Sequence, residues 1–164
     1  LRNERDILFR FIGEGPEKNS FLSFIKESKI ENVQLFEWMS QENLLHQISE
    51  ADVCLGAFGD TPQSLMTVQN KIYECLAMGK PIITGDSQAV RDTIPPNTIL
   101  LCNRDNPDEI ADAIIMLKND QEKRQSLSKN SLELFNNNFS TIKLGQQISN
   151  YLRELADKKR NNDR

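Results

Sequence analysis

The sequence predicts an α/β fold built around a doubly wound parallel sheet. Five short apolar segments are spread along the chain, and each is followed by a stretch with helical spacing of apolar residues. The five segments lack the alternation of polar and apolar residues that marks a sheet with one face in water. Short apolar strands that alternate with helices are typical of parallel strands covered on both faces. We therefore expect about five strands in a single domain over residues 1–164, with extra helices at its carboxyl end.

The first expected strand is ILFRFI (7–12), which ends at the turn Gly13-Glu14-Gly15-Pro16. A helix follows this turn, because apolar residues recur there at spacings of three and four from Phe21 to Ile25. We also expect one helix that ends near residue 51, a second that begins near residue 70 and a short third one near residue 89. The four remaining strands are expected at VQLFEW (33–38), VCLGAF (53–58), PIIT (81–84) and TILLC (98–102).

The last third of the chain reads as helical. Asn106 and Pro107, with Glu109 in the first turn, form a strong helix start: a capping amide, a proline at the first position and an acid that can bond back to the cap. This helix continues to Leu117, and two more are expected at about 127–135 and from a Ser140 cap onward. Residues 140–164 are expected to form a closing helix and a polar tail.

Length and charge exclude several classes of protein. A chain of 164 residues suits one domain, and a net charge of −4 gives no general attraction to nucleic acid or to an anionic membrane. No apolar run is long enough for a membrane span, and the first residues lack a signal peptide's apolar segment. We therefore expect a soluble, cytoplasmic protein with no nucleic-acid partner. The absence of an initiator methionine before Leu1 suggests a part of something larger.

The three cysteines, Cys54, Cys75 and Cys102, are widely spaced among apolar neighbours, unlike a metal or disulfide framework. They are expected to be buried, reduced thiols. The only histidine, His46, lies in a helical pattern and is expected on a helix surface. With no clustered metal ligands and no Ser-His-Asp or Cys-His set, we assign neither a metal site nor a catalytic residue.

Ligands of an open parallel sheet bind beyond the carboxyl ends of its strands, so the loops there are the candidate sites. After the first strand, Gly13 and Gly15 would let a phosphate or sugar approach the backbone closely. The third glycine of a dinucleotide-binding motif is absent, because Lys18 occupies its position. A plain tight turn explains the two glycines equally well.

The connection after the third strand, residues 59–69, is longer than the two to six residues usual in α/β units. The helix behind it starts with Asn70 as an expected cap, followed by Lys71 and Glu74. A lysine is unfavourable near the positive end of a helix dipole, so Lys71 suggests a bound anion such as a diphosphate. Glu74 lies on the same helix face and could accept hydrogen bonds from the two hydroxyls of a ribose. The alternative is a surface Lys71–Glu74 ion pair.

Two other loops carry weaker signals. Asp86 and Ser87 follow the fourth strand, where either could simply cap the next helix. Trp38 ends the second strand and could form a flat wall for a base, although core packing accounts for it equally well.

The segment QNKIYECLAMGKPIITGDS (69–87) resembles the donor-binding segment of the group 1, or family 4, retaining glycosyltransferases of the GT-B fold. Two further stretches resemble the same family in the same order along the chain: FRFIGEGPEK (9–18) and VQLFEWMSQENLLHQISEADVCLGAF (33–58). The resemblance implies a Rossmann-like C-terminal domain that binds a nucleotide diphosphate sugar without a metal or other cofactor. A glycan or lipid-linked acceptor would be held by a separate N-terminal domain, which would also make any membrane contact.

The resemblance also implies roles for individual residues. Glu74 would bind the donor ribose, and Lys71 would hold the diphosphate together with backbone N–H groups of the turn at Thr67, Val68 and Asn70. Gly13 and Gly15 would line the cleft between the two domains.

The sequence departs from the family at two places. A second glutamate is often found eight residues before the ribose-binding one, and here that position is Met66. The family's first strand in this domain, with its basic pair, does not precede Leu1, so we expect a chain truncated at its N-terminus and inactive alone. The other readings left open are a nucleotide-sugar epimerase of similar architecture and a non-catalytic doubly wound binding module.

Overall fold

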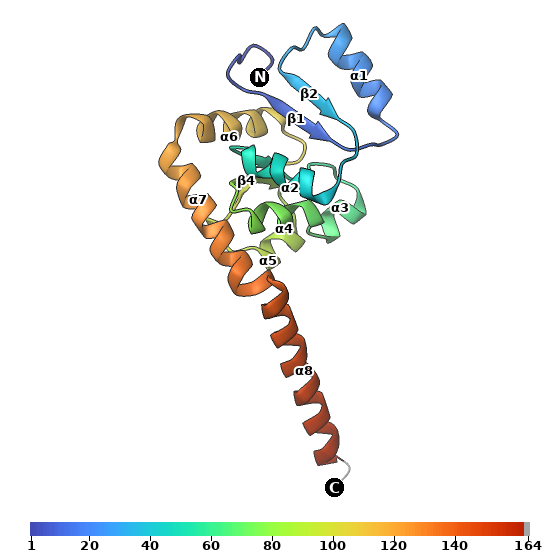
Figure 1. Ribbon diagram of the computed structural model, residues 1–164, viewed down its shortest axis with the longest axis vertical. Coiled ribbons are helices and arrows are strands. Elements are labelled where there is room, and N and C mark those ends of the chain that lie inside the picture. Colours follow the sequence, from blue (N-terminus) through green and yellow to red (C-terminus); the bar gives the residue numbers. More distant parts are fainter. Residues whose placement is uncertain (163–164) are drawn as a thin grey trace. The chain divides into compact units, whose positions relative to one another are not determined.

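The structure is a computed structural model that describes residues 1–162 (Figure 1). By its internal contacts the chain divides into two compact units, Leu1–Gln47 and a larger unit that begins at Ile48. The helix α2, Gln41–Glu50, spans this boundary. The expectation of a single domain over 1–164 stays a prediction.

The first unit contains the strands β1 (Phe9–Ile12) and β2 (Val33–Phe36) with the helix α1 (Lys18–Glu27) between them. The strands are parallel, with Phe9 opposite Val33 and Ile12 opposite Phe36. The ring of Phe11 meets that of Phe21 edge to face, with centroids 4.9 Å apart. This contact fastens α1 to β1.

The larger unit contains a three-stranded parallel sheet in the order β3-β4-β5, formed by Cys54–Leu55, Ile82–Gly85 and Leu100–Cys102. Every residue of the central strand β4 is buried, which explains why its sequence shows no alternation. The helices of this unit are α3 (Pro62–Met66), α4 (Asn70–Ala77), α5 (Gln88–Thr93), α6 (Pro107–Asn119), α7 (Gln121–Leu134) and α8 (Thr141–Asn162), with a π-helical turn η1 at Phe135–Phe139.

All five expected strands are present and parallel, as the predicted α/β class requires, but they pair as two sheets. The pair β1-β2 belongs to the first unit and the trio β3-β4-β5 to the larger unit. That the chain lacks the family's first strand stays a prediction.

The core of the larger unit lies between its sheet and the helices α6 and α7. Ile83 on β4, Leu117 on α6 and Leu127 on α7 are almost fully buried and belong to one cluster. Ile72 and Leu76 of α4 are also almost fully buried. The three cysteines are buried and free, as expected. A hydrogen bond with Cys54, together with burial, raises the pKa of the Cys75 thiol.

Side-chain caps start several helices. Asn106 accepts a hydrogen bond from the N–H of Glu109, as predicted, although the carboxylate of Glu109 bonds to the N–H of Asn103 instead of returning to the cap. Ser87 caps α5 by accepting from the N–H of Val90, so the capping interpretation of the Asp86-Ser87 pair is correct for Ser87.

The C-terminal part differs from the sequence-based expectation in two respects. First, α7 runs into an unpredicted π-helical turn, and at its end the hydroxyl of Ser140, which was expected to cap the last helix, donates to the carbonyl of Asn136 at 3.2 Å. The helix α8 continues to Asn162, so most of the expected polar tail is helical, and residues 163–164 lie outside the described residues. Within residues 1–162, no helix combines the length and the apolar character needed to cross a bilayer.

A candidate anion site at the start of α4

The carboxyl ends of β3 and β4 are joined by a compact set of hydrogen bonds. The backbone N–H of Gly56 donates to the carbonyl of Ile83, and that of Gly85 donates to the carbonyl of Ala57. The hydroxyl of Thr84 lies against Ala57, accepting from its N–H at 3.2 Å and donating to its carbonyl at 3.3 Å. This arrangement fixes the point at which the chain leaves β3 and enters the 59–69 segment.

The 59–69 segment contains a short helix that the sequence analysis did not predict. Residues Pro62–Met66 form the short helix α3, which Thr61 caps by accepting a hydrogen bond from the N–H of Ser64. Threonine followed by proline is a helix-start signal that the sequence analysis missed. Hydrogen bonds within the segment therefore hold part of it in place.

The N-cap of α4 is Gln69, and the prediction that Asn70 caps this helix is wrong. Gln69 has the extended backbone that a cap residue needs, whereas Asn70 already has helical geometry. The side chain of Gln69 does not cap the helix. Its amide nitrogen donates to the carbonyls of Ser64 and Thr67, both at 3.2 Å, and its oxygen is buried without a partner. The N–H of Ile72 donates to the carbonyl of Gln69, whereas the N–H groups of Asn70 and Lys71, the first two residues of α4, have no partner within the helix.

Lys71 is the second residue of α4 and is exposed. Among the described residues it makes no hydrogen bond or ion pair, so the alternative of a Lys71–Glu74 surface pair is absent from the structure. Partial desolvation by the surrounding protein lowers the pKa of Lys71. Glu74, one turn further along the helix, is half-buried. A free cation at the positive end of a helix dipole is an arrangement that an anion would stabilise.

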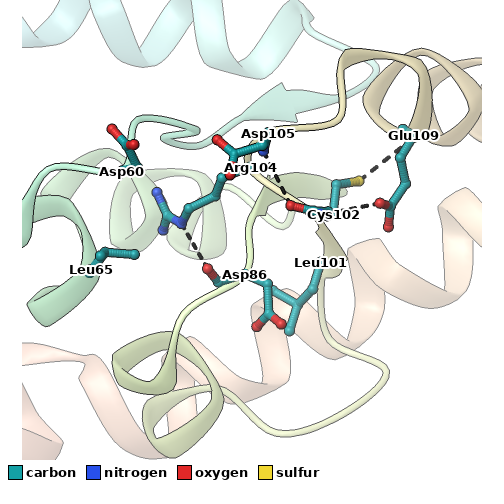
Figure 2. Close-up of a pocket in the computed structure, with 9 residues that line it drawn as sticks. Asp60, Leu65, Asp86, Leu101, Cys102, Arg104, Asp105 and Glu109 are labelled. Atoms are coloured by element: carbon teal, nitrogen blue, oxygen red, sulfur yellow. Dashed lines mark hydrogen bonds between the residues drawn. The ribbon is translucent and has the colours of Figure 1, made fainter.

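Residues of the 57–69 region contribute to the lining of two hollows. The smaller, of about 140 Å³, is lined by residues of the 57–69 region, including Thr61, Thr67 and Gln69. The larger, of about 530 Å³, lies beyond the carboxyl ends of β4 and β5 (Figure 2). Four carboxylates and one guanidinium line it: Asp60, Asp86, Asp105, Glu109 and Arg104.

Asp86 lies on the wall of the larger pocket and does not cap α5. One of its carboxylate oxygens accepts a hydrogen bond from Arg91 at 2.7 Å, and the other is buried without a partner. Within residues 1–162, no group of three or more potential metal ligands is clustered closely enough to hold a metal ion.

The other candidate residues belong to the first unit. Gly13 has a φ of 127°, which side-chain-bearing residues rarely adopt, whereas a side chain at Gly15 would meet open space. Glu14 and Lys18 form an ion pair at 2.6 Å, and this hydrogen bond raises the pKa of Lys18. Trp38 is 82% exposed, so the interpretation of Trp38 as core packing is wrong.

The structure therefore brings Thr67, Val68, Asn70, Lys71 and Glu74 together at one helix start of the larger unit. Gly13 and Gly15 lie in the first unit. His46 is exposed on α2, as expected. The residue that the sequence analysis missed is Arg104, which lines the larger pocket. Its partners are backbone carbonyls, which no sequence motif encodes.

Comparison with known proteins links this chain to one family. The model of the family described as glycosyl transferases group 1 matches residues 1–120. An α-D-kanosaminyltransferase from Streptomyces kanamyceticus is 26% identical over 157 residues, which cover 94% of this chain and 39% of that enzyme.

Solved structures share the fold of this chain. A sucrose-phosphate synthase from Thermosynechococcus elongatus superimposes with a TM-score of 0.73 and 22% identity over 91% of this chain and 38% of the other. HepE of Anabaena, crystallised with UDP-glucose, gives a TM-score of 0.76 and 15% identity over 92% of this chain and 42% of the other. The chain thus spans about two fifths of the length of these relatives.

Proposed function

Because this chain belongs to the group 1 glycosyl transferases, we propose that it binds a nucleotide diphosphate sugar, with the diphosphate at the start of α4. The observation that carries the proposal is Lys71, a cation without a partner among the described residues at the N-terminal end of a helix. The structure of HepE with UDP-glucose supports this class of ligand for a protein of the same fold.

In this proposal the ammonium of Lys71 and the opening N–H groups of α4 bind the diphosphate, together with the backbone at Thr67, Val68 and Asn70. Glu74 lies one turn along the same helix and accepts hydrogen bonds from the ribose hydroxyls. Gly13 and Gly15 line the cleft that faces the acceptor. No metal or other cofactor is required, because the helix start and Lys71 supply the positive charge.

The same contacts would assist sugar transfer. When the bond between the sugar and the diphosphate breaks, negative charge grows on the leaving phosphate. Positive groups already in place at the α4 start stabilise that charge without rearrangement. The sugar passes to a glycan or lipid-linked acceptor, which a separate domain holds in the cytoplasm, and any membrane contact belongs to that domain.

Lys71→Ala and Glu74→Ala are each expected to weaken binding of the nucleotide diphosphate about tenfold or more, since each removes a hydrogen bond that involves a charged group. Isothermal titration calorimetry of the unmodified chain first identifies which of UDP-glucose, UDP, GDP and ADP binds most tightly. The affinity of each variant for that ligand then measures the effect. Lys129→Ala and Glu133→Ala are matched controls, because these residues form an exposed lysine–glutamate pair on α7. Unchanged affinity in both α4 variants would contradict the site.

The affinity for the diphosphate is also expected to fall as the pH rises. Desolvation lowers the pKa of Lys71, so its ammonium loses its proton before an ordinary lysine does. Binding is therefore strongest below that lowered pKa and weakens as the pH rises through it, in a range below the one in which an ordinary lysine titrates. In Lys71→Arg the charge persists, and the affinity measured over the same range should stay flat. Identical profiles for the two proteins would exclude Lys71 as the titrating group.

A further inference from the structure

The guanidinium of Arg104, two residues after β5, binds four backbone carbonyls from two distant stretches of the chain. In one stretch it donates to Gly59 at 2.5 Å and to Ser64 at 3.3 Å. In the other it donates to Gly85 at 3.0 Å and to Asp86 at 2.7 Å. Figure 2 shows this side chain reaching across the pocket wall toward Asp86. Arg104 thus ties the 59–69 segment to the end of β4.

The space for this side chain depends on Gly85. A Cβ on Gly85 would lie 2.6 Å from Cγ of Arg104 and 2.8 Å from the carbonyl oxygen of Ala57. The backbone at the end of β4 is therefore shaped to let Arg104 pass. Four carboxylates line the same pocket, yet Arg104 forms no ion pair within the described part of the chain. Its hydrogen bonds go to backbone, as expected of a residue that orders a loop.

The hydrogen bonds continue from Arg104 to the start of α4. The carbonyl of Ser64 accepts both from Arg104 and from the side-chain amide of Gln69, the N-cap of α4. The carbonyl of Gly59 likewise accepts from Arg104 and from the hydroxyl of Ser64. A continuous path of hydrogen bonds therefore runs from the guanidinium through α3 to the residue that precedes Asn70.

We infer that Arg104 is a positioning residue for the anion site: it holds the 59–69 segment so that the first N–H groups of α4 and Lys71 are placed to bind a diphosphate. The inference rests on the proposed function of that site. Arg104 acts through the loop and not through its charge. The planar guanidinium fork is what allows it to reach several carbonyls at once, and a lysine ammonium cannot do so.

The test compares Arg104→Lys, Arg104→Gln and Arg104→Met with the unmodified chain by two measurements. Hydrogen exchange without nucleotide reports on the amides of residues 59–69, and titration with UDP reports on the anion site. All three variants should accelerate exchange in this segment and weaken UDP binding about fivefold or more, which corresponds to the worth of about one ordinary hydrogen bond. Hydrogen exchange in α6 should stay unchanged in variants that retain the fold. If Arg104→Met does not fold, Arg104→Gln provides the same comparison.

Arg91→Met is the matched control, because Arg91 also bonds to Asp86 but reaches only its carboxylate. This variant should leave both the 59–69 exchange and the UDP affinity unchanged. If Arg104→Lys binds UDP as tightly as the unmodified chain, a positive charge alone is sufficient, and the inference that Arg104 acts by positioning the 59–69 segment is overturned. Unchanged exchange in residues 59–69 for all Arg104 variants also overturns it, while leaving the anion site intact. If the unmodified chain binds no nucleotide diphosphate, the proposed function fails instead, and with it the role of Arg104 in binding.

Discussion

Replacing Leu76 by alanine is expected to lower the free energy of unfolding of the chain by about 2–5 kcal/mol. Leu76 lies on α4 and is 0% exposed. Its helix packs on β4, α7 and η1, so the removed atoms would leave a cavity that several elements would have to move to close. The cost is therefore the lost burial of the side chain together with the cavity.

Urea denaturation followed by circular dichroism measures this loss. Met66→Ala is the control, because Met66 is 76% exposed and its truncation should change the free energy of unfolding by only about 0.5 kcal/mol or less. Equal losses in the two variants would show that α4 is not part of the packed core. The comparison also separates stability from binding: Leu76→Ala weakens the fold, whereas Lys71→Ala removes a charge that makes no hydrogen bond or ion pair with the described residues.

The elements that sequence reasoning predicted correctly are those with a local signal. The strand PIIT is apolar throughout because both faces of β4 are buried. The Asn106-Pro107 pair starts α6 because a side-chain cap and a fixed φ act within a few residues. The position of Lys71 at a helix start was predicted in the same way, while its role in binding stays a prediction.

The elements that were missed depend on contacts between distant residues or on fine geometry. The four acceptors of Arg104 are backbone carbonyls 18 to 45 residues away, and no residue type marks a carbonyl. The cap of α4 shifts by one residue because Gln69, not Asn70, has the extended backbone. Trp38 was weighed by residue type alone, but whether an aromatic ring is covered depends on the whole fold.

The second large effect is expected from Gly56→Ala, which should lower the free energy of unfolding by about 3 kcal/mol. Gly56 follows β3, and a Cβ there would lie 2.2 Å from Oγ1, 2.4 Å from Cβ and 3.2 Å from Cα of Thr84. Thr84 is 0% exposed on the central strand, so it has no room to withdraw. The added methyl group must therefore push β3 and β4 apart or displace the hydrogen bonds of Thr84 to Ala57.

Thermal and urea unfolding measure the cost, with Gly15→Ala as the control because a Cβ on Gly15 meets nothing within 4 Å. The cause can be tested by adding Thr84→Gly, which removes the two closest atoms but also forfeits the hydroxyl bonds to Ala57. If the clash is the cause, Gly56→Ala should cost less in the Thr84→Gly background than alone, since residues in contact are not additive. Equal costs in both backgrounds would refute the steric account. Because the backbone beyond Gly56 leads into the segment held by Arg104, the single variant should also weaken UDP binding, and the double variant should recover part of it.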